Sequence, residues 1–452
     1  MRTFDVVVIG AGPAGEVAAG RIGDGGLSVA IVEDRLVGGE CSYWACMPSK
    51  SLLRPYEALE EARRIPGAAE AINGRLDVQA VLDRRDEVIH DLDDSVQLPW
   101  LDNHGVTLVR GSARLVGERR VRVGEDELGA ARAVIIATGS LPAMPPIEGL
   151  GAIDDAWTNR EATTAKAVPD RMVIMGGGVV GVEMAQAFQT LGSQVALIEG
   201  ERRLLPREEE YACAQVTEAL AGYGVDIRTG QKATRVEERD GSVVVTTKDG
   251  ATADGDTLLV ALGRKPQTDG LGLEEVGLEG GGPVQVDAHM RVDGSEWLYA
   301  IGDANGRALF THMGKYQGRI AADHILGRET AISHGADGPL SPRVIFTEPQ
   351  VAAVGHTTDT AREAGLRVDV VDTETSGNAG GSFYGRGAPG TARILIDRER
   401  QVVVGATITG AEVADMLHAA TVAIVGEIPV QRLRHAVPCF PTRSEIWLSL
   451  LP

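Results

Sequence analysis

The sequence is poor in cysteine and has no long apolar run. Its 452 residues contain four cysteines, Cys41, Cys46, Cys213 and Cys439, which are too few for a framework of structural disulfides. No apolar stretch reaches the length that spans a bilayer, and the first residues lack a basic leader with a cleavage site. We therefore expect a cytoplasmic protein that makes no membrane contact.

Positive charge is also scarce, and lysine especially so. The chain has 64 acidic and 44 basic side chains, a net charge of −20, which opposes binding to nucleic acid or to an anionic membrane surface. Six of the basic residues are lysines, so Lys50 and Lys265 stand out where they lie beside motifs. A chain of this length is compatible with about three domains.

An apolar strand over residues 4–9 runs into a glycine-rich turn. A helical stretch and a second strand follow, and the motif glycines are Gly10, Gly12 and Gly15. The first glycine allows a tight turn, the second lets the backbone approach a pyrophosphate, and the third lets the helix pack on the strand. The second strand ends at Glu33, 23 residues after Gly10, where a carboxylate binds a ribose hydroxyl. The unit predicts a dinucleotide site.

The same unit occurs a second time. A strand over residues 172–175 precedes Gly176, Gly178 and Gly181, and the next strand ends at Glu199, again 23 residues after the first motif glycine. Two nicotinamides would have no reaction to share, whereas a flavin and a nicotinamide form a hydride relay. The repeat therefore predicts one flavin and one nicotinamide nucleotide on the same chain.

Two cysteines lie five positions apart in the stretch 38–50, just before Pro48. On a regular helix this step rises about 7.5 Å, too far for an unstrained disulfide, so the pair must straddle a distorted helix start. Pro48 suits a first helical turn, and Cys46 would then lie at the positive end of a helix, which favours a thiolate. The second ligand pair of a zinc site is absent. We favour a redox-active dithiol without a metal, and the alternative is a pair of buried structural thiols.

The rest of the chain shows further strands and one change of character. Residues 83–96 have the pattern of a charged amphipathic helix, residues 133–140 form a strand and small-residue turn, and a strand over 297–303 delivers Asp303 at its carboxyl end, where ligands of parallel sheets bind. From residue 341 the pattern is mixed. It predicts antiparallel strands at 393–397 and 401–406 and a helix from about 411 to 425.

These motifs, in this order, resemble the pyridine nucleotide-disulfide oxidoreductases, also called flavoprotein disulfide reductases. The resemblance rests on the pattern Gly-Gly-x-Cys-x4-Cys-x-Pro-Ser-Lys, on both glycine motifs, and on the segments 137–139, 302–303 and 346–355. It implies an α/β fold with two Rossmann-like domains and an α+β dimerisation domain. The implied bounds are 1–147 with 258–338 for FAD, 148–257 for NAD(P), and 339–452 for the part that builds a homodimer.

The resemblance also implies roles for individual residues. Cys46 would contact the flavin as a charge-transfer thiolate, and Cys41 would attack the substrate. Lys50 would pair with Glu183 beside the flavin, and His312 lies in a segment similar to the one that passes under the ring. The implied cofactor-binding residues are Gly10, Gly12, Gly15, Glu33, Thr138, Gly139, Gly302, Asp303, Gly176, Gly178, Gly181 and Glu199.

One residue departs from the pattern of lipoamide and glutathione reductases. Those enzymes carry a histidine near the C-terminus that acts as acid and base in the partner's active site, and this chain has Phe440 there, with Glu445 retained. Phenylalanine cannot move protons, and such help is typically worth about 10² to 10⁴ in rate. Nearby His435 and Cys439 could compensate or could be structural.

We expect an FAD-dependent NAD(P)H oxidoreductase that passes electrons to Cys41–Cys46 and on to a disulfide or dithiol, as dihydrolipoamide dehydrogenase does. Because of Phe440, the alternative is a non-disulfide acceptor such as Hg²⁺ or a quinone, or chemistry like that of ketopropyl coenzyme M carboxylase. A flavin-binding structural subunit is a third possibility. Tyr43 and Trp44 suit an apolar or planar substrate or simply wall the pocket.

The residue at the end of the second strand bears on the choice of nicotinamide. Glu199 would bind a 2′-hydroxyl and repel a 2′-phosphate, so we expect NADH rather than NADPH, although Arg202 and Arg203 nearby oppose this choice.

Overall fold

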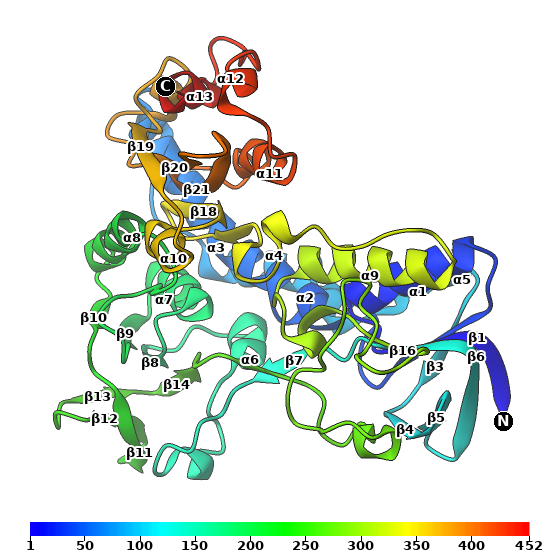
Figure 1. Ribbon diagram of the computed structural model, residues 1–452. Helices are drawn as coiled ribbons and strands as arrows, with labels where there is room; N and C mark the ends of the chain where they lie inside the picture. Colours follow the sequence, from blue (N-terminus) through cyan, green and yellow to red (C-terminus); the bar gives the residue numbers. More distant parts are fainter. Residues whose placement is uncertain (452) are drawn as a thin grey trace. The chain divides into compact units, whose positions relative to one another are not determined.

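The computed structural model describes residues 1–451, without the side chain of His334 (Figure 1). These residues form two compact units, each built from three separate segments. Unit 1 contains residues 1–48, 86–143 and 264–339, and unit 2 contains the residues between and after them. Within the described residues, no helix combines the length and apolarity needed to cross a bilayer, and no group of three or more His, Cys, Asp or Glu side chains could hold a metal.

Unit 1 is organised around a seven-stranded sheet with the order β3-β2-β1-β6-β5-β4, in which β16 also pairs with β6. The parallel strands are β1 (Arg2–Ile9), β2 (Val29–Glu33), β3 (Val106–Arg110), β6 (Asp126–Ile136) and β16 (Leu298–Ala300). The strands β4 (Ala113–Gly117) and β5 (Arg120–Val123) extend β6 in antiparallel fashion. Val6, Val7 and Val8 of β1 are fully buried, as expected for a parallel strand covered on both faces.

Helices of unit 1 cover this sheet and carry the glycine and cysteine motifs. They are α1 (Pro13–Asp24), α2 (Gly39–Tyr43), α5 (Leu98–Asn103) and α9 (Thr311–Ile325). The helices α1 and α9 pack against each other so closely that a Cβ at Gly318 would lie 2.7 Å from the carbonyl oxygen of Ala14. The short strands β7 (Ser140–Pro142) and β15 (Arg264–Pro266) pair antiparallel, and η6 (Gly302–Asn305) follows β16.

The middle part of unit 2 repeats the strand-helix-strand pattern. A parallel sheet has the order β10-β9-β8-β14, with β8 (Arg171–Met175), β9 (Gln194–Ile198), β10 (Asp226–Arg228) and β14 (Thr257–Val260). Its helices are α6 (Asn159–Thr164), α7 (Val179–Thr190) and α8 (Glu210–Gly222), and a three-stranded antiparallel sheet is formed by β11 (Ala233–Arg239), β12 (Ser242–Thr247) and β13 (Thr252–Gly255).

The C-terminal part of unit 2 is an antiparallel sheet of five strands with the order β17-β18-β21-β20-β19. The strands are β17 (Arg343–Ile345), β18 (Gln350–Gly355), β19 (Val368–Glu374), β20 (Thr391–Asp397) and β21 (Val403–Gly410), and the helices are α10 (Thr358–Glu363), α11 (Leu417–Val425), α12 (Val430–Leu433) and α13 (Ile446–Leu450). Unit 2 also holds most of α3 (Cys46–Arg64) and α4 (Val78–Val88).

The mixed α/β fold and the two repeated β-α-β units are confirmed, whereas the expected bounds of two helices were wrong. The helix expected over 83–96 is α4, which begins earlier, at Val78, and ends at Val88, because the backbone takes positive φ values at His90, Asp91 and Leu92. The helix expected from residue 411 begins at Leu417, since Glu412 has a φ of 51°. A left-handed residue interrupts the helical hydrogen-bond ladder, and none of these four residues is a glycine that would have revealed it.

Candidate active site

The first glycine motif of unit 1 leaves open space at the start of α1. A Cβ at Gly10 would collide with the carbonyl of Ala137, and one at Gly15 would collide with the carbonyl of Gly10, so both positions require glycine. A Cβ at Gly12 would meet nothing within 4 Å, and Gly12 caps α1 without any side-chain hydrogen bond. The backbone N–H groups of the first helical turn therefore face room for an anion such as a pyrophosphate.

Glu33 lies at the end of β2 and is fixed by the glycine turn. Its carboxylate accepts hydrogen bonds from the backbone N–H groups of Ala11, at 2.8 Å, and Arg35, at 2.9 Å. Burial raises its pKa against the effect of these bonds. Thr138, at the end of β6, has a buried hydroxyl without a hydrogen-bond partner among the residues that the structure describes. A hydroxyl placed in this way fits a ligand that supplies the missing partner.

Asp303 belongs to a polar network that the sequence did not reveal. The Ser140 hydroxyl donates to Asp303 at 2.5 Å, and Nε of Arg264 donates to the Ser140 hydroxyl at 2.7 Å. Arg264 also lies 3.5 Å from the carboxylate of Glu40, the residue before Cys41. Burial raises the pKa of Asp303, while the bond from Ser140 opposes this. The preceding residue, Gly302, has a φ of 66°.

The two thiols lie on either side of a break between helices, as the spacing predicts. Cys41 is in α2, which ends at Tyr43, and Cys46 is the first residue of α3. Both thiols are half-buried. The Cys46 sulfur lies 3.4 Å from the Thr311 hydroxyl at the start of α9. A hydrogen bond with Cys46, together with burial, raises the pKa of Cys41.

Two aromatic residues, Tyr43 and Trp44, lie between the two cysteines in the sequence. The Tyr43 side chain is buried, and its hydroxyl has no partner within the described part of the chain. The Tyr43 and Trp44 ring centroids are 5.9 Å apart. Tyr43 is therefore part of the buried interior of unit 1, whereas Met47, one residue beyond Cys46, is half exposed.

The second glycine motif, in unit 2, has the same geometry as the first. A Cβ at Gly176 would collide with the carbonyl of Ala261, and one at Gly181 with the carbonyl of Gly176, while Gly178 again has nothing within 4 Å. Glu199 accepts hydrogen bonds from the backbone N–H groups of Gly177, at 2.5 Å, and Glu201, at 2.7 Å. The two acids at the strand ends are thus held by equivalent backbone donors.

Lys50 and Glu183 form an ion pair in unit 2. The Lys50 ammonium lies 2.8 Å from Oε2 of Glu183, and Oε1 of Glu183 accepts the backbone N–H of Phe346 at 2.9 Å. The ammonium also lies 4.8 Å from the centroid of the Phe346 ring. The Glu183 side chain is 4% exposed and that of Lys50 is 33% exposed. The pair therefore presents one accessible positive charge that a buried carboxylate holds in place.

The C-terminal segment of unit 2 presents Phe440 to solvent in the single chain. Its side chain is 77% exposed, and Cys439 and His435 are also exposed. Glu445 closes a capping box with Thr442, whose backbone N–H donates to the carboxylate at 3.3 Å. Within one chain, Glu445 thus has a structural hydrogen bond.

The expected residues fall into two groups. In unit 1, the first glycine motif, Glu33, Thr138, Gly139, Gly302 and Asp303 accompany Cys41 and Cys46, and in unit 2 the second glycine motif and Glu199 accompany Lys50, Glu183, Phe440 and Glu445. Sequence reasoning missed Ser140, Arg264, Thr311 and Phe346. Arg264 stands beside the noted Lys265, but the other three lie in motifs with no charge signal.

Two observations test whether dinucleotides fit these sites. Each glycine motif is open at its second glycine, Gly12 or Gly178, which is the position of backbone approach to a pyrophosphate. Each is followed by a fixed carboxylate, Glu33 or Glu199, at the end of the next strand. The buried, unpartnered hydroxyl of Thr138 adds a further polar contact in unit 1. The residues present therefore fit one dinucleotide in each unit.

Comparisons with known proteins agree over nearly the full chain. The family described as pyridine nucleotide-disulphide oxidoreductase matches residues 4–321, and its dimerisation domain matches residues 341–450. A dihydrolipoyl dehydrogenase of Thermus scotoductus is 34% identical over 98% of this chain and 96% of its own length. A mercuric reductase of Lysinibacillus sphaericus is 30% identical over 98% of this chain and 81% of its own.

Solved structures give the same result. LpdA from Mycobacterium tuberculosis superimposes with a TM-score of 0.87 at 25% identity, covering 100% of this chain and 99% of the other. The HOCl-induced flavoprotein disulfide reductase RclA from Escherichia coli, as a Cu(II) complex, superimposes with a TM-score of 0.85 at 25% identity, covering 98% and 99%. The matched dimerisation domain supports a homodimer. The chain belongs to the pyridine nucleotide-disulfide oxidoreductases and is an FAD-dependent enzyme of that family.

Proposed function

We propose that this enzyme uses NADH and exchanges electrons with a small dithiol or disulfide of the lipoamide class through Cys41 and Cys46. The observation that carries the proposal is the thiol pair at the break between α2 and α3. It lies in the same unit as the first glycine motif, where we place FAD. The dihydrolipoyl dehydrogenases among its relatives, at 30% identity or more over nearly the whole chain, support this substrate class.

The sulfur chemistry follows from the two thiols. When Cys41 loses its proton, its thiolate attacks one sulfur of the substrate disulfide, that S–S bond breaks, and the leaving sulfur takes up a proton. The Cys46 thiolate then attacks the Cys41 sulfur in the mixed disulfide, which releases the second substrate thiol, again with uptake of a proton. The substrate gains two electrons, and the Cys41–Cys46 disulfide has formed. The same steps in reverse oxidise a dithiol.

The other residues bind and orient. FAD, when bound, would supply the two-electron chemistry that links the nicotinamide to the protein disulfide. Gly12 and Glu33 would hold its pyrophosphate and ribose, and Asp303 its ribityl chain. Lys50, kept in place by Glu183, supplies a positive charge where negative charge develops on reduction.

Proton transfer to the substrate sulfurs is not assigned to Phe440. We propose that this side chain, exposed in the single chain, lines the partner's substrate site as an apolar wall, and that solvent provides the protons. The cost is a slower thiol exchange, since general acid–base help is typically worth about 10² to 10⁴.

Support for NADH over NADPH comes from Glu199 and Arg203. The Glu199 carboxylate is fixed by two backbone N–H groups at the end of β9, and such a carboxylate binds a 2′-hydroxyl and repels a 2′-phosphate. Arg203, which could attract that phosphate, donates instead to the carbonyls of Pro206, at 3.3 Å, and Glu208, at 3.5 Å.

Anaerobic titration of the FAD-loaded enzyme with NADH tests the proposal. The oxidised enzyme should consume NADH and develop long-wavelength absorption from a thiolate beside the flavin, and the reduced enzyme should then reduce lipoamide. The variant Cys41→Ser should still take up electrons from NADH but should no longer reduce lipoamide. A tenfold preference for NADPH in kcat/KM would refute the choice of nicotinamide, and electron uptake without any thiolate absorption would refute the dithiol route.

A further inference from the structure

The loop 199–209 joins β9 to α8 and begins with Glu199, the ribose-binding residue of the proposed function. Its middle lies on the second glycine motif: the Leu205 N–H donates to the carbonyl of Gly177 at 2.9 Å, and Leu204 is fully buried. Leu205 has a φ of 51°, a conformation that non-glycine residues adopt rarely and that the surroundings must stabilise. The loop therefore does not hold its shape through local preference alone.

The far end of the loop carries two buried acids that pair with arginines from the C-terminal sheet. Glu208 and Glu209 are 6% and 5% exposed. Arg343, at the start of β17, donates to both carboxylate oxygens of Glu208, at 2.7 and 2.9 Å. Because both side chains of this pair are largely buried and the contact is bidentate, it fixes the direction of Glu208 strongly.

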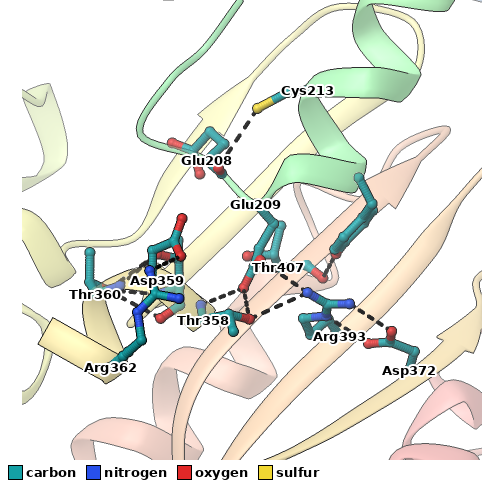
Figure 2. Close-up of polar contacts among 12 residues, drawn as sticks. Glu208, Glu209, Cys213, Thr358, Asp359, Thr360, Arg362, Asp372, Arg393 and Thr407 are labelled. Atoms are coloured by element: carbon teal, nitrogen blue, oxygen red, sulfur yellow. Dashed lines mark hydrogen bonds and ion pairs between the residues drawn. The ribbon is translucent and has the colours of Figure 1, made fainter. Parts of the chain in front are cut away.

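Glu209 is held in the same way by a second arginine (Figure 2). Arg393 of β20 lies 3.0 Å from its Oε2, while Thr358 donates its backbone N–H and its hydroxyl to Oε1, at 2.7 and 2.9 Å. Arg393 is itself oriented by two bonds of 2.8 Å to Asp372. The start of α8 is thereby anchored to two strands and to the first turn of α10.

These contacts connect directly with the ribose-binding end of the loop. Arg203 donates to the carbonyl of Glu208 and lies 3.9 Å from Asp359 of α10, and the Cys213 thiol donates to the carbonyl of Leu205 at 3.2 Å. Glu201, whose N–H fixes Glu199, stands between the two anchored ends. Release of Glu208 would therefore loosen the loop around Glu201, the one backbone donor to the ribose-binding carboxylate that belongs to the loop, whereas the other donor, Gly177, lies in the glycine motif.

We propose that Arg343 is a positioning residue for the pyridine nucleotide: by holding Glu208, this arginine of the dimerisation domain keeps the loop 199–209 in the shape that binds the adenosine half of the cofactor. The inference rests on the proposed role of Glu199. Arg393 supports the same loop through Glu209. A residue that binds a ligand must be held by its neighbours to within about 0.5 Å of the binding geometry. Here those neighbours, Arg343 and Arg393, belong to the five-stranded sheet of unit 2.

The test compares Arg343→Met, Arg343→Lys and Glu208→Gln with the parent as FAD-loaded dimers. The dissociation constant of NADH is measured by titration calorimetry, and flavin reduction at saturating NADH by rapid mixing. For Arg343→Met we expect the dissociation constant to rise about tenfold or more, with the saturated reduction rate within about twofold of the parent. Arg343→Lys should restore part of the affinity, and ADP-ribose should lose affinity in parallel with NADH.

The matched control is Arg398→Met, which removes an equal charge from the exposed pair with Asp369 in the same domain. Its NADH affinity should equal that of the parent. Should Arg343→Met fail to fold, Glu208→Gln and Arg393→Lys carry the same comparison. A folded Arg343 or Glu208 variant with unchanged NADH affinity overturns the inference. If the parent binds NADPH in place of NADH, the proposed choice of nicotinamide is overturned instead. The effect of Arg343 and Glu208 on cofactor affinity is then measured with NADPH.

Discussion

Glu183 orients Lys50 through a contact of 2.8 Å while its second carboxylate oxygen holds the backbone of Phe346. We predict that Glu183→Gln lowers the rate of flavin reduction by NADH about tenfold, because the amide keeps the bond from Phe346 but no longer fixes the ammonium. Since Lys50 is one third exposed, the loss of stability should be only about 1 to 2 kcal/mol. Stopped-flow reduction and thermal unfolding measure the two effects.

Glu60→Gln is the control for that prediction, because it removes a carboxylate that pairs with the exposed Arg63 on α3, the helix that carries Lys50. Its reduction rate should match the parent. Equal rates in the Glu183 and Glu60 variants would show that the ion pair has no role in reduction.

Two glycines of the same motif should respond differently to alanine. Gly12→Ala meets nothing within 4 Å, so the apoprotein should fold normally, while FAD should bind at least tenfold more weakly because the methyl group occupies the space for the pyrophosphate. Gly15→Ala drives its methyl group into the carbonyl of Gly10, so the fold itself should be destabilised. Circular dichroism of the apoproteins and fluorescence titration with FAD separate the two. Normal FAD affinity in Gly12→Ala would contradict the placement of the pyrophosphate at Gly12.

The reactivity of Cys41 should depend on its neighbours. Its pKa is raised by the hydrogen bond with Cys46 and then by burial, and Lys315 opposes the shift. A raised pKa means less thiolate near neutral pH, so alkylation by iodoacetamide should be slow at pH 7 and should accelerate toward high pH. Cys46→Ala removes the largest cause and should accelerate alkylation about tenfold at pH 7.5, whereas Lys315→Met should slow it a few-fold. Peptide mass spectrometry identifies the modified residue. An alkylation rate in Cys46→Ala equal to that of the parent would show that Cys46 does not raise the pKa of Cys41.

Replacement of Phe440 by histidine should test the missing proton carrier. If the side chain lines the partner's site, Phe440→His should raise lipoamide turnover about tenfold or more and introduce a dependence on a group with a pKa near 6.5. The control Phe440→Leu should leave turnover and its pH profile unchanged. If Phe440→His does not raise lipoamide turnover, the lack of a proton carrier at this position does not limit the reaction.

Glu16 should make the stability of the enzyme depend on pH. Burial raises the pKa of this α1 carboxyl to about 7, with Lys315 opposing the shift. The folded state thus keeps a proton that the unfolded chain releases near pH 4.5, so stability is lost as the pH rises from about 4.5 to about 7. Glu16→Gln removes this penalty and should raise the melting temperature at pH 8 but not at pH 4.5, by an amount equivalent to about 2 to 3 kcal/mol. Equal melting curves at pH 8 would contradict the shift.

Local chemistry explains why much of the site could be predicted from the sequence. The glycines at positions 10 and 176 have φ values of 104° and 109°, and the break before Cys46 follows from the five-residue spacing of the thiols. Each of these features depends on backbone geometry within a few residues, which residue type and spacing determine directly.

The parts that could not be predicted depend on contacts between distant segments. Arg343 and Glu208 are 135 positions apart, and Ser140 and Asp303 are 163 apart. Ser140 is a small residue without charge in its motif, Arg343 stands in no motif, and an arginine at the start of a strand is usually a solvated charge. The positive φ of Leu205 is likewise invisible in the sequence, because its cause is the packing of the loop on Gly177.

The way in which the chain alternates between the two units has a consequence for synthesis on the ribosome. The strand β6 acquires its neighbour β16 only when residue 300 has been made, after every strand of the parallel sheet in unit 2 has already left the ribosome. Domains of many proteins fold in order from the N-terminus, but here the N-terminal unit is complete only at residue 339. The exposed edge of its sheet must wait for roughly 160 residues beyond β6, so the dinucleotide site of unit 1 should be completed only after the strands of the second dinucleotide site have been synthesised.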